Sequence, residues 1–103
     1  MSKSLTITEL DLIHPGEILL EDFMKPLGIS QNRLARDLDV PVSRVAGLVA
    51  GTRAITGDTA LRLARFFGTT ADLWMNLQAE HELRLARRLR GEEIAQRVRT
   101  LAA

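Results

Sequence analysis

The sequence lacks cysteine and tyrosine, and its aromatic residues are three Phe and one Trp. Without cysteine, the chain forms neither a disulfide nor a thiolate metal site. Its longest apolar runs are far shorter than the roughly 18 residues of a membrane-spanning helix. The N-terminal MSKSLTITELDL also lacks the continuous apolar region of a signal peptide. We therefore expect a soluble, cytoplasmic protein that does not associate with membranes.

Sequence features of enzymes are also scarce. His81 and Glu82 match the start of a zinc-binding HExxH motif, but Leu85 stands where the second histidine is needed. The stretch GLVAGTR at 47–53 has neither the spacing nor the lysine of a phosphate-binding P-loop. No Ser-His-Asp order or cysteine nucleophile is present. We expect no catalysis, no cofactor and no metal.

Strand signals are limited to residues 5–13 (LTITELDLI), which are compatible with an edge strand or with a loose arm. The rest of the chain is divided into short helices by capping residues, glycine and proline. The first expected helix runs from Pro15 to a stop at Pro26 and Gly28, and the third from about Val42 to Ala50 before Gly51. The other three each follow an N-cap: the second begins at Gln31 after Ser30, the fourth follows Thr56 and ends at Phe67 before Gly68, and the fifth follows Thr70 and runs from about Ala71 to Leu89. We expect Gly91 to interrupt the last helix, beyond which residues 92–103 form another helix or fray.

Apolar residues at helical spacing indicate the buried faces. The expected core positions are Ile18, Leu19, Phe23, Leu27, Leu34, Ala35, Leu38, Val45, Leu48, Ala60, Leu61, Leu63, Ala64 and Phe67.

Charge is unevenly distributed along the chain. Residues 1–29 carry two Lys and five acidic residues, whereas residues 30–65 carry six Arg and three Asp. Residues 80–103 carry six Arg and four Glu. A basic middle segment offers the local positive potential that a nucleic-acid site needs.

Residues 30–48 (SQNRLARDLDVPVSRVAGL) fit two short helices joined by a tight turn, the arrangement that reads duplex DNA. Their apolar residues have the spacing that packs the two helices at a steep angle, with Ala35 allowing a close approach. The residues left exposed are Gln31, Arg33, Pro41, Val42, Ser43, Arg44 and Gly47.

The chemistry of these exposed residues suits DNA. Arg44 is the best candidate for a bidentate contact to guanine, and Val42 can touch a thymine methyl group. Arg33 and Arg53 are better placed for phosphate contacts. We expect three further arginines to be solvated surface residues: Arg36, Arg62 and Arg65.

Residues 14–88 resemble the HigA-type antitoxins of the lambda-repressor-like (XRE) helix-turn-helix class. The resemblance rests on HPGEIL at 14–19, SQNRLA at 30–35, VPVSRVAGLVAGTRAIT at 40–56, LRLARFFGT at 61–69 and ADLWMNLQ at 71–78. It implies an all-α, five-helix domain with a long C-terminal helix, with the short N-terminal strand left open. It also implies that Gln31 contacts phosphate and that Val42, Ser43 and Arg44 face base edges.

The same resemblance implies a protein partner, a HigB toxin of the RelE-like class that cuts mRNA, together with repression of the chain's own operon. Toxins of that type are basic, so the acidic segment 1–29 offers a complementary surface. The candidates for this contact are Glu9, Asp11, Glu17, Glu21 and Asp22. The alternative is a stand-alone XRE-type repressor without a toxin partner.

Reading duplex DNA also favours a homodimer, because one recognition helix covers only a half-site. The expected dimer surface lies on the long C-terminal helix, at Leu73, Trp74, Leu77, Leu83, Leu85 and Leu89. The domain organisation is then an arm (1–13), a helix-turn-helix domain (14–69), and a C-terminal dimerisation segment (70–103) packed on the same domain.

Gly47 and Gly51 lie four residues apart near the recognition helix. Gly51 is expected to end that helix in a left-handed conformation and to direct Thr52 and Arg53 toward the DNA backbone. Gly47 lies one turn after Ser43 on the exposed face and has no side chain with which to contact a base. We therefore expect the helix to approach DNA closely at Gly47.

Overall fold

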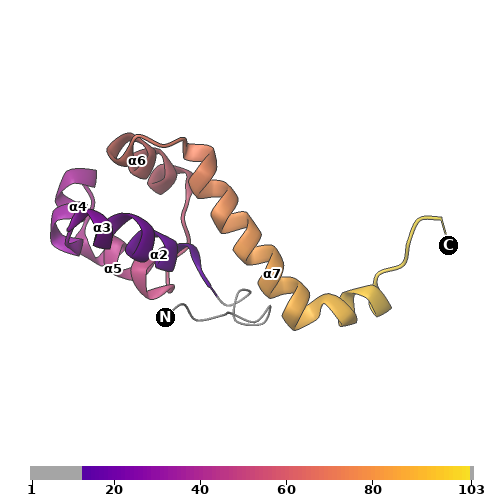
Figure 1. The fold of residues 1–103 in the computed structure, drawn as a ribbon. Coiled ribbons are helices and arrows are strands. Elements are labelled where there is room, and N and C mark those ends of the chain that lie inside the picture. The colour runs from indigo at the N-terminus through magenta and orange to yellow at the C-terminus, as the bar shows by residue number, and fades with distance from the viewer. Residues whose placement is uncertain (1–12, 103) are drawn as a thin grey trace.

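The computed structural model describes residues 13–102, and within this range the chain folds into five helices without a β-strand (Figure 1). The predicted all-α fold class is thereby confirmed. The expected strand or arm at the N-terminus falls almost wholly outside the described residues. Among the described helices, none is both long and apolar enough to cross a membrane.

The first helix consists of three consecutive segments, and each later helix is a single segment. In chain order the elements are α2 (Pro15–Ile18), η1 (Leu19–Met24), α3 (Lys25–Leu27), α4 (Gln31–Leu38), α5 (Val42–Ala50), α6 (Gly57–Phe67) and α7 (Ala71–Arg97).

The first helix contains a π-helical turn, η1, that the sequence did not indicate. The expected stop at Pro26 is wrong, because the helix continues to Leu27 and ends at Gly28, whose φ is +63°. In a regular α-helix the proline ring would clash with the carbonyl four residues earlier, and a wider π turn just before it relieves that clash. The wider turn also changes which residues face inward. Met24 is buried, whereas Leu27 is 61% exposed instead of lying in the core.

The N-caps of α4, α6 and α7 and the glycine stops of α5 and α6 follow the sequence prediction. Ser30, Thr56 and Thr70 each accept a hydrogen bond through the side-chain oxygen from the backbone N–H three residues on. Gly51 and Gly68 end α5 and α6 with φ of +79° and +72°. Such caps satisfy the free backbone groups at helix ends, so the chain can make short helices with sharp turns between them.

The core lies where the first helix, α4, α5, α6 and the start of α7 meet. Its buried apolar residues are Leu19, Met24, Ile29, Leu34, Ala35, Leu38, Val45, Leu48, Ile55, Ala60, Leu63 and Trp74. Trp74 contacts Phe23 and Phe67, and it donates a 2.8 Å hydrogen bond from its ring nitrogen to Thr69. The expected core position Leu61 is wrong, because that side chain is 66% exposed.

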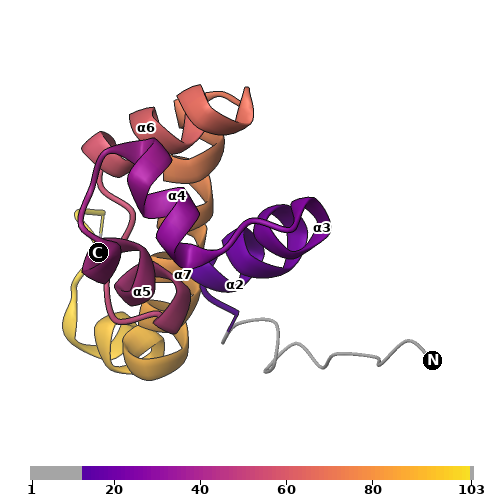
Figure 2. The same ribbon diagram turned by 90° about the vertical axis from the view of Figure 1, so that its left-hand side faces the viewer.

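α7 is longer than expected and runs from Ala71 to Arg97, so Gly91 does not interrupt it. Its first turns pack on α6 and on α2. Its C-terminal part extends away from the rest of the molecule and carries no buried residue after Gln78 (Figure 1). The side of the molecule that carries α4 and α5 is shown in Figure 2, where α6 lies beside α4 and α2 lies beside α5.

Candidate nucleic-acid interface

α4 and α5 form the predicted pair of packed helices. α4 ends at Leu38, and the C-cap residue Asp39 adopts a left-handed conformation with φ of +57°. The N–H of Val40 then donates to the carbonyl of Ala35, which closes the turn. Leu34 and Leu38 of α4 are buried, as are the inward residues of α5, Val45 and Leu48. The inner faces of the motif are therefore as the sequence predicted.

The first turn of α5 presents side chains outward. Val42 is 46% exposed, Ser43 is exposed, and the Arg44 side chain is 28% exposed. Pro41 precedes this helix and offers no side-chain acceptor, in contrast to the hydroxyl caps of α4, α6 and α7. The first backbone N–H groups of α5 therefore lack a side-chain cap, and free N–H groups at a helix N-terminus favour an anionic group such as phosphate.

Arg44 is ion-paired rather than free. Its Nη1 lies 2.6 Å from Oδ2 of Asp58, in the first turn of α6. The same carboxylate oxygen accepts a 2.9 Å hydrogen bond from Nε of Arg62. The hydrogen bond from Arg62, followed by that from Arg44, lowers the pKa of Asp58 below its ordinary value of 3.8. The two arginines and one aspartate together carry a charge of +1.

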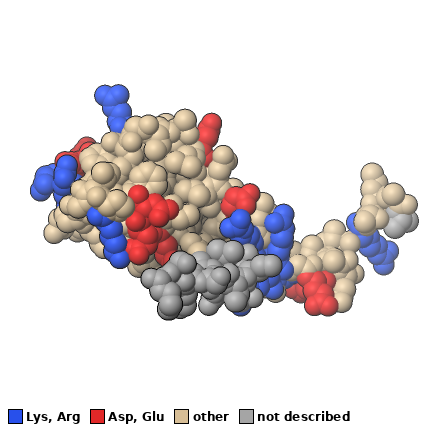
Figure 3. All heavy atoms as spheres, in the orientation of Figure 1, with Lys and Arg blue, Asp and Glu red and all other residues tan. Residues whose placement is uncertain are grey.

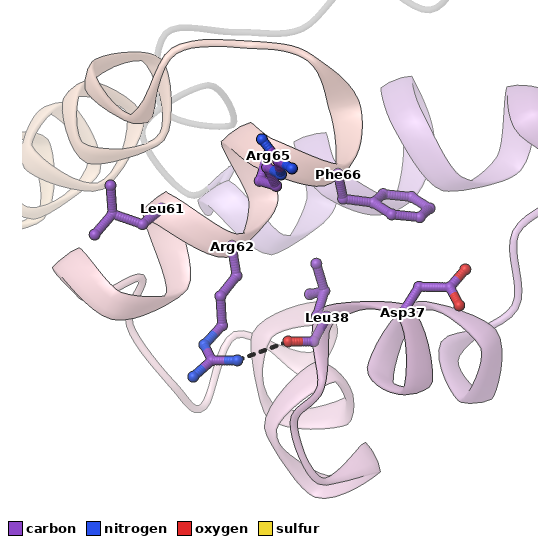
Figure 4. A pocket seen from close by; sticks show the side chains of 6 residues that line it. All are labelled: Asp37, Leu38, Leu61, Arg62, Arg65 and Phe66. Carbon is purple, nitrogen blue, oxygen red and sulfur yellow. Dashed lines mark hydrogen bonds between the residues drawn. The ribbon is translucent and has the colours of Figure 1, made fainter.

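Arg62 links α6 to the turn of the motif and is not the solvated residue that the sequence suggested. Its Nη1 donates to the carbonyl oxygen of Leu38 at 2.8 Å and to that of Asp39 at 3.2 Å. Figure 4 shows this side chain reaching from α6 to the end of α4, while Leu61 points away from α4. The two carbonyls belong to the last turn of α4, where helix carbonyls lack intrahelical partners. The charge pattern of the sequence does not indicate this contact, because Arg62 and Leu38 are 24 residues apart in the chain.

The hollow that Arg62 crosses is a shallow feature between α4 and α6, with a volume of about 380 Å³ (Figure 4). It is lined by Asp37, Leu38, Leu61, Arg62, Arg65 and Phe66.

The loop after α5 folds back over Gly47. The backbone N–H groups of Thr52 and Arg53 both donate to the carbonyl of Gly47, at 3.0 and 3.1 Å. A Cβ atom added at Gly47 would lie 3.1 Å from Cβ and 3.5 Å from Nε of Arg53. Because residues three and four apart share a helix face, Arg53 lies beside the face that carries Ser43 and Arg44. Arg53 therefore occupies the space that a side chain at position 47 would take.

Two predicted phosphate contacts lie at the start of α4. Gln31 is the first residue of this helix and is partly exposed. Arg33 is exposed, and its Nε lies 3.4 Å from Oδ2 of Asp37. An exposed pair of this length restrains the arginine only weakly.

The other end of α5 is held against the first helix by residues for which the sequence indicated no role in packing. A Cβ atom added at Gly16 would lie 1.6 Å from the carbonyl oxygen of Leu48, so only glycine permits this approach of α2 to α5. The His14 ring caps α2 by accepting from the N–H of Gly16, and it would lie within 3.0 Å of a Cβ atom at Gly51. The HPGE motif therefore has a packing role.

Gln78 provides a second link to the region after α5. Its side chain is buried, and its Oε1 accepts a 2.9 Å hydrogen bond from the backbone N–H of Ile55. A buried N–H group without a partner destabilises a fold, so this amide supports the loop that leads from α5 to α6. The glutamine at the end of ADLWMNLQ can thus be explained by a single buried contact.

The acidic candidates for a protein partner divide into two groups. Glu9 and Asp11 lie outside the described residues. Glu17, Glu21 and Asp22 are exposed on the first helix, and Glu21 pairs with Lys25 at 2.6 Å. Acidic side chains gather over this helix in Figure 3. The three residues therefore share one accessible surface.

The candidates for a dimer surface also divide. Trp74 is fully buried in the core of its own chain, so its assignment to the dimer surface is wrong. Leu77 and Leu85 are partly buried. The exposed members are Leu73 (37%), Leu83 (50%) and Leu89 (74%), and further along the chain Ile94 (46%) and Val98 (63%) are also exposed.

Comparisons with known proteins agree on the fold. The family described as Helix-turn-helix matches residues 20–74. Virulence-associated protein I of Dichelobacter nodosus is 49% identical over 78 residues, which cover 76% of this chain and 72% of that protein. The antitoxin HigA of Pseudomonas aeruginosa, solved with the higBA promoter, is 43% identical with a TM-score of 0.83, and the match covers 86% of this chain and 97% of that one. The antitoxin GraA in complex with its operator is 37% identical with a TM-score of 0.84, covering 100% and 99%.

Proposed function

The chain belongs to the XRE-type helix-turn-helix family, with HigA-family antitoxins as structural neighbours, and on that premise we propose that it binds operator DNA and represses its own operon. The observation that carries this proposal is the first turn of α5. It points Val42 and Ser43 into solvent on a helix whose opposite face is buried in the motif. Two similar structures, HigA with the higBA promoter and GraA in complex with its operator, are complexes with DNA.

We assign the DNA contacts as follows. α5 enters the major groove, where Arg44 donates to O6 and N7 of a guanine, Val42 touches a thymine methyl group and Ser43 contacts a base edge. The remaining residues contact the phosphate backbone, which adds affinity and salt dependence but little sequence information. They are Gln31, Arg33, Thr52 and Arg53, with Gly47 allowing the backbone to come close.

Selection from a randomised duplex library with the full chain tests the DNA-binding proposal. Duplexes of about 30 base pairs hold two half-sites one helical turn apart. We expect enrichment of a two-fold symmetric sequence that also occurs upstream of the chain's own gene. Failure of any sequence to enrich at physiological salt would refute the proposal.

We also propose that the chain acts as a homodimer, in which residues 14–69 read DNA and residues 70–103 form the contact between copies. The exposed leucines of α7 support this division, because contact with a second copy would remove their apolar surface from water. Light scattering at micromolar concentration should give twice the monomer mass. A strict monomer, with and without the selected duplex, would contradict the division.

The second proposed activity is neutralisation of a basic HigB-like toxin. The exposed acidic surface of the first helix, with Glu17, Glu21 and Asp22, supports an electrostatic contact with such a partner. The alternative function is that of a stand-alone repressor of the same family.

A binding assay with the product of the adjacent reading frame separates these alternatives. We expect that protein to be small and basic and to be captured by the chain, and we expect the charge reversal of Glu21 and Asp22 to Lys to weaken capture. Reversal of Glu92 and Glu93 on α7 is a control with the same charge change. Equal binding by both variants would remove the first helix from the contact, and an unrelated neighbouring gene product would favour the stand-alone repressor.

A further inference from the structure

The Arg44–Asp58–Arg62 cluster joins the recognition helix to α6 through a single carboxylate oxygen. Oδ2 of Asp58 lies 2.6 Å from Nη1 of Arg44 and 2.9 Å from Nε of Arg62. Arg62 in turn donates to the carbonyls of Leu38 and Asp39. The aspartate is thus tied to the turn of the motif, which fixes where its carboxylate stands relative to α5.

The contact leaves Arg44 able to bind a base. Only Nη1 donates to Asp58, so the edge formed by Nε and Nη2 keeps two parallel N–H donors. A guanine presents two acceptors, O6 and N7, in the matching arrangement. An arginine that is already oriented loses less side-chain freedom on binding than one that is free in solvent.

The same carboxylate opposes unspecific contacts. An arginine without a partner pairs readily with any backbone phosphate, and such contacts do not depend on sequence. Asp58 is 56% exposed beside the outward face of α5, where its negative charge repels phosphate. Its two effects on Arg44 therefore favour a base contact over a phosphate contact.

We propose that Asp58 is a positioning residue that sets the sequence selectivity of the chain by holding Arg44 in a base-reading orientation and away from phosphate. This inference rests on the proposed DNA-binding function and names a residue outside the helix-turn-helix pair as a determinant of that function. Asp58 itself makes no base contact in this scheme.

The test measures the affinity of the full chain for the library-selected duplex and for a scrambled duplex of the same composition, as a function of salt. For D58N we expect tighter binding to the scrambled duplex and a ratio of selected to scrambled affinity that falls about fivefold or more. The salt dependence of binding to the scrambled duplex should steepen by about one phosphate contact for each copy bound, because Arg44 is released to phosphate.

Two controls separate positioning from a general effect of charge or folding. Asp37 pairs with Arg33 on α4, so D37N removes the same charge from another ion pair, and we expect it to leave the affinity ratio unchanged. In the R44A background, D58N should no longer change the ratio, because the residue through which Asp58 acts is absent. Thermal unfolding of each variant monitors folding.

The possible results separate the positioning role of Asp58 from the DNA-binding function on which it rests. No selected duplex for the wild-type chain would overturn the DNA-binding function. If R44A lost selective binding and D58N kept it, the role of Asp58 would be overturned while the DNA-binding function would stand. The inference would also be overturned if D58N lowered the ratio of selected to scrambled affinity equally in the wild-type and R44A backgrounds. The same holds if D37N and D58N lowered that ratio equally.

Discussion

At its C-terminal end α5 is fixed by close backbone packing, whereas near its N-terminal end it is joined to α6 by the partly exposed Arg44–Asp58–Arg62 cluster. Leu48 presents its carbonyl to Gly16 at a distance that excludes a side chain, and the His14 ring covers Gly51. At the other end, Arg44 and Asp58 meet in solvent-accessible surroundings. The packed end determines where the helix lies, and the charged end determines where its side chains point. Substitutions at the two ends should therefore affect different quantities.

The largest effect is expected at Gly16, in the packed end. A methyl group in G16A would overlap the carbonyl oxygen of Leu48, so α2 and α5 must separate. We expect the free energy of unfolding to fall by about 3 kcal/mol, measured by urea denaturation. G57A is the matched control, since a Cβ atom at Gly57 meets no atom within 4 Å. Equal stabilities of G16A and G57A would show that the close approach is not needed.

A smaller loss is expected for Q78L, which removes the acceptor of the buried Ile55 N–H group. We expect unfolding to become easier by about 2 kcal/mol, because the N–H is left without a partner. The DNA affinity of the folded Q78L protein should fall by the same factor for every duplex, whatever its base sequence. N76L, at an exposed position on the same helix, is the control. A selective loss of binding to one base pair in Q78L would contradict the division between the two ends.

Gly47 lies between the two ends, and its replacement should change binding more than stability. In G47A the new methyl group lies 3.1 Å from Cβ of Arg53, so that side chain must shift. Alanine also favours helix by about 1 kcal/mol, which offsets the crowding in unfolding measurements. We expect weaker binding to the selected and scrambled duplexes alike. Tighter and equally selective binding would show that neither the shift of Arg53 nor a close approach of the backbone matters.

The smallest effect concerns pH and the charged end. Because the folded-state pKa of Asp58 is lowered, its ion pairs stabilise the fold above its ordinary pKa of 3.8, and this contribution is lost as the pH falls through the still lower folded value. The stability difference between wild type and D58N should therefore be constant from pH 7 to about 4 and shrink below that. A difference that already disappears near pH 6 would contradict the assignment of these ion pairs.

Much of the fold could be predicted from the sequence because its signals are local. Ser30, Thr56 and Gly51 act within a few residues of themselves, so their roles as caps and stops are confirmed. The π turn before Pro26 was missed, since a proline ordinarily marks a helix boundary. At Gly91 the helical preference of the surrounding residues outweighs the cost of one glycine.

The candidate site was predictable in part for the same reason. Helical periodicity places Val42 and Ser43 on the outward face of α5, and the structure leaves both exposed. Periodicity does not reveal that Arg44 pairs with a residue 14 positions away or that Arg62 reaches the end of α4. These contacts depend on how α6 packs against the motif. Trp74 was misplaced because an apolar residue at helical spacing fits a core and a dimer surface equally well.

Binding of R44A to single-base-pair variants of the selected duplex tests most directly whether α5 reads operator DNA. If Arg44 contacts a guanine, the wild-type chain should discriminate against replacement of that base pair by about 1–3 kcal/mol, and R44A should lose this discrimination at that position alone in each half-site. Uniform weakening of R44A across all variants, with the wild-type preference intact at every base pair, would contradict the base-reading role of the recognition helix.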